Sequence, residues 1–129
     1  MNIPAELRYT TDHEWLRSVG DQLIIGVTDF AQETMGDVVH IELPLVGSSL
    51  RAGDVVAEIE TTKSVSEVYA PVAGTIADVN SDVGEHAELV NADPYGAGWL
   101  FALKPSDPFA VEALLDCASY EAIVREAAE

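Results

Sequence analysis

The sequence has little cysteine and little positive charge. Its single cysteine, Cys117, has no partner for an internal disulfide and cannot build a cysteine-based zinc site. A chain of this kind fits a reducing compartment, so we expect the cytoplasm, with a mature organellar protein as the alternative. We interpret Cys117 as a small buried hydrophobic residue rather than as a nucleophile.

Basic residues number 6 and acidic residues 23, which gives a formal net charge of −17 over 129 residues. Nucleic-acid phosphates and anionic membrane surfaces are bound by clustered lysine and arginine, so the charge excludes both as partners. Proteins that bind this chain should instead present positive patches, and their association should slow as salt is added.

Long hydrophobic runs are also missing. No run approaches the ~20 apolar residues that cross a membrane as a helix. Residues 1–8 lack the apolar core of a signal peptide and carry an acid early, unlike a transit peptide. The hydrophobic content of 48% is nevertheless sufficient for a core, and the length suits a single domain over residues 1–129.

No familiar catalytic motif occurs: the nucleophile elbow, the H-E-x-x-H zinc motif, the P-loop and the dinucleotide glycine pattern are all absent. The three histidines, His13, His40 and His86, are far apart and lack the i, i+4 spacing of helical metal ligands. We therefore predict no metal site and no catalytic residues. A small hydrolase or metalloenzyme built on the histidines is the less favoured alternative.

The most informative stretch predicts a β-hairpin. β-Branched residues favour strands at 55–61 and 65–69, which meet near Lys63. Their connection contains no Gly, Asn or Asp, so a primed turn would force positive φ on Thr, Lys or Ser, and a type I turn is expected. Lys63, one of only two lysines with Lys104, is then placed at or next to an exposed tip with its amine in water.

The remaining pattern predicts a mainly β protein, a two-sheet sandwich. Further strands are expected at residues 9–19, 22–27, 37–43, near 50, 75–79 and 99–103. Residues 53–59 resemble residues 84–89. Two similar halves joined through the lysine hairpin would give pseudo-twofold symmetry, whereas chance similarity of turn chemistry is the alternative.

Helices are expected in two places. A short helix over residues 29–35 would be capped by Asp29, with Gln32 at the capping-box position and Gly36 as its left-handed stop. C-terminal helices are expected over 107–127, the first opening at Pro108 and the second running from Ser119 to about Glu126. Their sandwich-facing residues are predicted to be Val111, Leu114, Leu115, Ile123 and Cys117.

The surroundings of Lys63 resemble lipoyl- and biotinyl-attachment domains, in which a tip lysine is acylated by a cofactor acid. Gly-Asp, an apolar strand, Glu-x-x-Lys, a second strand and Ala-Pro-x-x-Gly follow in that order. Biotin carriers usually have Met on both sides of the lysine, whereas here the neighbours are Thr62 and Ser64. Lipoyl domains of the 2-oxo acid dehydrogenases commonly have Asp before it and Ala after it, and they lack this N-terminal third.

Motifs on both sides of the lysine closely resemble the glycine cleavage system H protein family, over about residues 7 to 120. They lie at residues 13–16, 25–32, 35–44, 70–74, 79–80, 89–96 and 98–99. Two departures occur. Glu60-Thr61-Thr62-Lys63-Ser64 replaces the frequent Glu-Ser-Val-Lys-Ala, and Phe30 stands where some members have His. The glutamate three residues before the lysine is kept, so a modifying enzyme can still recognise the site.

The resemblance implies a barrel-sandwich hybrid with a lipoyl-like core over about residues 37–104, N-terminal strands over 7–27 and a helical segment over 107–127. It implies lipoic acid on Lys63 and a carrier without its own active site. The arm takes an aminomethyl group from a pyridoxal-phosphate glycine decarboxylase (P protein) to a folate-dependent aminomethyltransferase (T protein). A dihydrolipoyl dehydrogenase (L protein) then reoxidises the dithiol, and lipoyl-attaching enzymes are further implied partners.

A loaded arm carries a cationic amine beside a hydrolysable bond, and both are safer in a water-poor cleft with a carboxylate. We hypothesise that Glu14 and the Asp29-Phe30 segment line this cleft, because they lie in family-like motifs outside the lipoyl core. The alternative is that Glu14 is a solvated acid and Trp15 is core. Two other functions stay open: a relay that supplies lipoyl groups to other proteins, and an unmodified acidic binding module.

Overall fold

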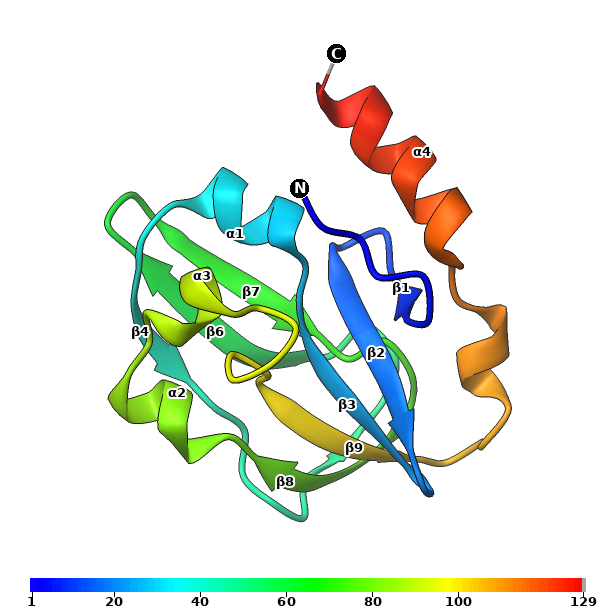
Figure 1. Ribbon diagram of the computed structural model, residues 1–129. Coiled ribbons are helices and arrows are strands. Elements are labelled where there is room, and N and C mark those ends of the chain that lie inside the picture. Colours follow the sequence, from blue (N-terminus) through cyan, green and yellow to red (C-terminus); the bar gives the residue numbers. More distant parts are fainter. Residues whose placement is uncertain (129) are drawn as a thin grey trace.

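The computed structural model describes residues 1–128, which form an open sandwich of two antiparallel sheets. The strands are β1 (Arg8–Tyr9), β2 (Glu14–Val19), β3 (Gln22–Val27), β4 (Val38–Glu42), β5 (Ser49–Leu50), β6 (Val55–Thr61), β7 (Val65–Tyr69), β8 (Gly74–Val79) and β9 (Phe101–Pro105). One sheet has the order β1-β2-β3-β9-β8-β5, and the other has the order β4-β6-β7 (Figure 1). The predicted two-sheet β sandwich is confirmed.

The helices are short and lie at the ends of the sandwich. They are α1 (Asp29–Met35), α2 (Ser81–Glu85), α3 (Leu89–Ala92), the 3₁₀ helix η1 (Ala110–Ala113) and α4 (Cys117–Ala128). The predictions missed α2 and α3, and where a helix was expected to open at Pro108 the chain forms only η1. Within residues 1–128, no helix has the length and apolarity needed to cross a membrane.

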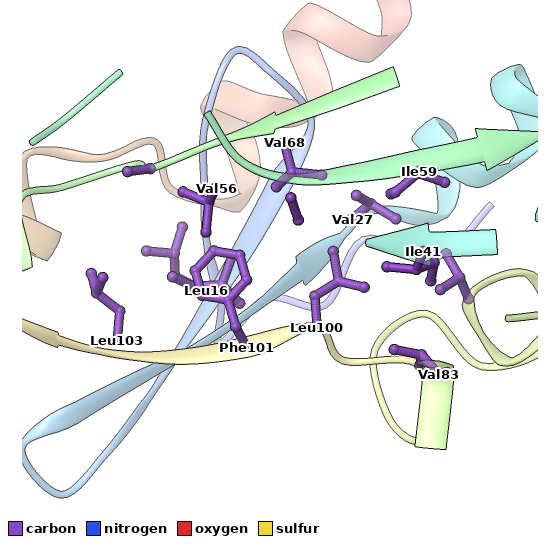
Figure 2. Close-up of a cluster of buried hydrophobic side chains, with 14 of the residues drawn as sticks. Leu16, Val27, Ile41, Val56, Ile59, Val68, Val83, Leu100, Phe101 and Leu103 are labelled. Carbon is purple, nitrogen blue, oxygen red and sulfur yellow. The ribbon is translucent and has the colours of Figure 1, made fainter. Parts of the chain in front are cut away.

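The main core fills the space between the two sheets, as Figure 2 shows for residues of both. Side chains of β6 point alternately toward the core and toward solvent: Ile59 and Thr61 are buried, whereas Glu58 and Glu60 are exposed. Phe101 and Leu103 of β9 are buried in the same core. The period-2 pattern therefore gives the small sheet an apolar inner face and an acidic outer face.

A second cluster of buried side chains attaches the C-terminal region to the larger sheet. It consists of Leu7, Tyr9, Trp15, Tyr120 and Val124. Half-buried Cys117 packs against it, and so does Leu115, whose backbone exchanges two hydrogen bonds with that of Tyr9. From α4 the cluster takes Tyr120 and Val124 rather than the predicted Ile123. Val111 and Leu114 pack against the main core as expected.

Two predictions of local structure are wrong. The strand expected over residues 9–19 is interrupted, because β1 ends at Tyr9, a turn follows, and β2 begins only at Glu14. In that turn Thr10 Oγ1 accepts hydrogen bonds from the backbone N–H groups of Asp12 and Glu14. The suggested repeat is not structural, since residues 53–59 lead into β6 whereas residues 84–89 run from the end of α2 to the start of α3.

Gly26 supports the N-terminal sheet by making room for an indole. It pairs with Trp15 across β2 and β3, and a Cβ at Gly26 would lie 2.7 Å from Trp15 Cε2 and Nε1. The indole cannot move freely, because it is fully buried and its Nε1–H donates to Pro94 O at 2.9 Å.

Replacing Gly26 with alanine is therefore expected to lower the free energy of unfolding by ~1–3 kcal/mol, the usual cost of overpacking. Urea denaturation measures the change. Gly84→Ala is the matched control, because the nearest contact of its added Cβ is Leu43 Cδ1 at 4.0 Å. The control should be neutral or stabilising in a helix, and equal effects of the two substitutions would contradict the packing argument.

Candidate functional site

Lys63 lies in the connection between β6 and β7 and is exposed. Buried Thr61 fixes this tip: its N–H donates to Ser64 O at 2.8 Å, and its Oγ1 accepts from the N–H groups of Lys63 at 3.2 Å and Ser64 at 3.1 Å. Among residues 1–128, His13 is the only non-glycine residue with positive φ, so the predicted absence of a primed turn is confirmed. Thr61 stands where the family often has Ser, and its hydrogen bonds give it a clear structural role at this tip.

The side chain of Lys63 lies over the end of α1. A Cβ at Gly36 would be 3.1 Å from Lys63 Cε and 3.5 Å from its Nζ. Gly36 also ends the helix with φ 81°, a conformation that disfavours other residues. The positive φ therefore favours glycine beside the lysine, whereas the flexible end of the Lys63 side chain could move away from an added Cβ.

Asn91 forms hydrogen bonds to the connection between α1 and β4, which lies beside Lys63. Its Oδ1 accepts from Val38 N at 2.9 Å, and its Nδ2 donates to Gly36 O at 2.9 Å and to the Gln32 side chain at 3.1 Å. The hairpin tip joins this connection where Thr62 N donates to the carbonyl of residue 37. Sequence reasoning missed this role, although Asn91 lies in one of the family-like motifs.

A cleft of about 350 Å³ opens beside Lys63, bounded by α1 and β7. This volume is within the ~300–1,000 Å³ of typical small-molecule sites. Its apolar lining consists of Val27, Phe30, Ala31, Met35, Ile59 and Val68. Its polar lining consists of Asp12, His13, Glu14, Thr34, Ser64, Ser66 and Glu67. The cleft thus combines an apolar wall with several carboxylates.

Glu14 is the most unusual group in the cleft, because its carboxylate is 2% exposed. Oε2 accepts from Tyr69 N at 2.9 Å, and Oε1 accepts from Thr10 Oγ1 at 3.2 Å. Burial raises the pKa of Glu14 to about 8, although both hydrogen bonds oppose the rise. The alternative interpretation is therefore half right: Glu14 is not a solvated acid, but Trp15 does lie in the core.

Phe30 and His13 lie together on the cleft wall, with ring centroids 4.9 Å apart. Burial lowers the pKa of His13, and the nearby charge of Asp12 opposes this. Within residues 1–128 no three His, Cys, Asp or Glu side chains are grouped to hold a metal ion. His40 and His86 are exposed and lie on other elements.

Asp29 does not reach the cleft, contrary to the prediction. Its carboxylate accepts from Asn2 N at 2.9 Å and from Gln32 Nε2 at 2.7 Å. The N-cap of α1 is Thr28, whose Oγ1 accepts from Ala31 N, so the predicted cap was one residue too late. With Thr28 as N-cap, Gln32 lies one residue past the capping-box position, and its side chain bonds Asp29.

Comparison with known proteins gives a consistent result. A family model described as glycine cleavage H-protein matches residues 7–127. The chain is 47% identical over 126 residues to the glycine cleavage system H protein of Anaeromyxobacter sp. (strain K), covering 98% of each chain. It is 48% identical over 124 residues to that of Bacteroides thetaiotaomicron, covering 96% of this chain and 98% of the other.

A solved structure agrees with these sequence matches. The crystal structure of a glycine cleavage system H protein from Mycobacterium marinum superposes with a TM-score of 0.84 at 38% sequence identity, covering 93% of this chain and 97% of that chain. The resemblance seen in the separate motifs is thereby confirmed over nearly the whole sequence, and the chain belongs to the glycine cleavage H-protein family.

Proposed function

We propose that this protein is the lipoyl-bearing carrier of the glycine cleavage system and that Lys63 carries the lipoyl group. The proposal depends above all on one observation: Lys63 is exposed at a hairpin tip and also lies at a cleft that contains the buried carboxylate of Glu14. Exposure gives an attaching enzyme access to the amine. The cleft offers the modified side chain a place to lie.

The residues around Lys63 fit a lipoyl arm. Amide formation removes the charge of the lysine, so the side chain can contact the apolar cleft wall without a desolvation cost for an ammonium group. Gly36 leaves space for the side chain at the mouth, and Phe30 and Met35 line the wall beyond it. A lipoyl group on Lys63 would supply a redox-active disulfide at the end of a long neutral arm.

Glu14 is proposed to receive the cationic amine of the aminomethyl cargo. Its pKa of about 8 means that the carboxyl group is mostly protonated at neutral pH in the empty cleft. A cation nearby favours the carboxylate, so the arriving amine should displace a proton from Glu14 and gain a charged hydrogen-bond partner. Phe30 acts as an apolar wall beside it.

The proposed partners are the P, T and L proteins of the glycine cleavage system and the enzymes that attach the lipoyl group. An arm that visits several active sites has to start from a protruding position, which the β6–β7 hairpin provides (Figure 1). The net charge of −17 favours partners with basic patches around their active-site entrances. The chain acts as a carrier subunit, and its partners supply the catalytic centres.

Protein isolated from lipoate-replete cells is expected to show a lipoyl or octanoyl adduct on Lys63 by intact mass and site mapping. Lys63→Arg should abolish the adduct, because a guanidinium group is not acylated by such enzymes. The chain offers a matched control, since Lys104→Arg changes the only other lysine. A bare chain would support the unmodified binding module, and an adduct lost in Lys104→Arg but kept in Lys63→Arg would overturn the assignment to Lys63.

The cargo role of Glu14 predicts that Glu14→Gln hydrolyses its aminomethyl-loaded arm about tenfold faster or more, in line with the loss of one charged hydrogen bond. Glutamine keeps an oxygen for Tyr69 N–H, so the sheets stay joined. Release of formaldehyde and ammonia from the loaded protein measures the rate. Glu58→Gln, an exposed change on the outer face of β6, serves as the control, and equal rates in both variants would count against the role.

A third expectation concerns stability. Because the folded-state pKa of Glu14 lies above its usual 4.5, its stabilising contribution is full below that pH and is lost as pH rises through about 8. Relative to Glu14→Gln, the wild-type unfolding free energy should therefore fall by on the order of a few kcal/mol between about pH 5 and about pH 9. Urea denaturation across this range tests it, and parallel curves would show that Glu14 is not desolvated.

A further inference from the structure

One side chain of the C-terminal helix α4, that of Tyr120, contacts residues of the cleft wall. Tyr120 is fully buried, and its hydroxyl lies 2.9 Å from His13 Nδ1 and 2.7 Å from Thr28 Oγ1. Figure 1 shows that the rest of α4 leads away from the sandwich, beyond β1. The helix therefore contacts the cleft wall from behind.

Both partners of this hydroxyl shape the cleft. His13 lines it directly. Thr28 is the N-cap of α1, the helix that contributes Phe30, Ala31, Thr34 and Met35 to the lining. One hydroxyl group thus joins the two segments that form this side of the cleft, although neither is near Tyr120 in the sequence.

The hydrogen-bond pattern has two complete arrangements. Tyr120 can donate to His13 Nδ1 and accept from the Thr28 hydroxyl, or it can accept from a protonated Nδ1 and donate to Thr28 Oγ1. In each arrangement Thr28 Oγ1 still accepts from Ala31 N. Without the Tyr120 hydroxyl, both His13 and Thr28 lose a partner, and water does not easily replace it at Thr28, which is fully buried.

His13 has an unusual backbone conformation and a ring packed between two aromatic side chains. Its φ of 65° is rarely adopted by a non-glycine residue. Its ring is held between Phe30, with centroids 4.9 Å apart, and Tyr120, with centroids 5.7 Å apart. If its hydrogen bond to Tyr120 is lost, the ring can turn and open the cleft wall beside Phe30.

We propose that Tyr120 is a positioning residue for the cleft: its hydroxyl fixes the ring of His13 and the first turn of α1, and thereby keeps water away from the loaded arm. The consequence for the arm rests on the proposed carrier function. The link between α4 and the cleft wall is a property of the chain alone.

The test compares Tyr120→Phe with Tyr9→Phe in the full-length protein. Tyr9 stacks on Tyr120 with centroids 4.6 Å apart, and its hydroxyl donates to Pro4 O, away from the cleft. Each substitution removes one hydroxyl from the same cluster and keeps the ring. Urea denaturation of both variants gives the loss of stability from each hydroxyl, so that an effect on the cleft can be separated from an effect on the fold.

Two readouts are needed. In unlipoylated protein, nitrogen-15 NMR of the His13 ring should change in Tyr120→Phe and remain as in the wild type in Tyr9→Phe. In lipoylated, aminomethyl-loaded protein, Tyr120→Phe should hydrolyse the cargo about two- to tenfold faster, as expected for one lost hydrogen bond, while Tyr9→Phe keeps the wild-type rate. The first readout needs no lipoyl group, so it tests the link even if Lys63 proves unmodified.

His13→Asn is a second way to remove the hydrogen bond between the His13 ring and the Tyr120 hydroxyl. Asparagine is suited to this position because it tolerates positive φ. It should raise the hydrolysis rate, and adding Tyr120→Phe should raise it no further, since both changes remove one shared interaction. Unchanged His13 signals in Tyr120→Phe would overturn the positioning role. Altered signals with an unchanged rate, or fully additive rates, would overturn its consequence for the cleft.

Discussion

The carboxylate of Glu14 joins the two sheets at the cleft, and the geometry of the site depends on this contact. β7 is an edge strand of the small sheet, so backbone groups on one of its sides lack a strand partner. Glu14, the first residue of β2, provides that partner for Tyr69 N. Burying a carboxylate is costly, and the two donors from Tyr69 and Thr10 offset part of the cost. The raised pKa reflects the part that is not offset.

Around this contact the cleft is built from segments distant in sequence, each held by its own hydrogen bonds. Thr61 fixes the hairpin tip, Asn91 fixes the end of α1, and Tyr120 fixes the beginning of α1 together with His13. A bare hairpin would present a lysine but no cleft. The N-terminal strands and α4 therefore add a sheltered cleft beside the lysine that we propose as the attachment site.

The sequence predicted those parts that depend on local chemistry. The β-branched strands and the connection without Gly, Asn or Asp were sufficient to place Lys63 at an exposed tip with an unprimed turn. Contacts across long separations were not predictable: Tyr120 meets residues 107 and 92 positions away. The same holds for α2, because its N-cap Asn80 is held by the carbonyls of Ala97 and Trp99. The family motifs indicated Glu14, but only the fold shows that it is buried.

On the proposed carrier function, the charge on the Lys63 side chain explains how one lysine can be both accessible and sheltered. As a free amine, Lys63 favours water, where an attaching enzyme can reach it. As an amide it is neutral, and the apolar wall of Phe30 and Met35 becomes a favourable environment. The cationic cargo that we propose reverses the preference once more, and the carboxyl group of Glu14 is the buried acidic group in the cleft that could pair with it. In the proposed scheme the position of the arm follows from its charge state.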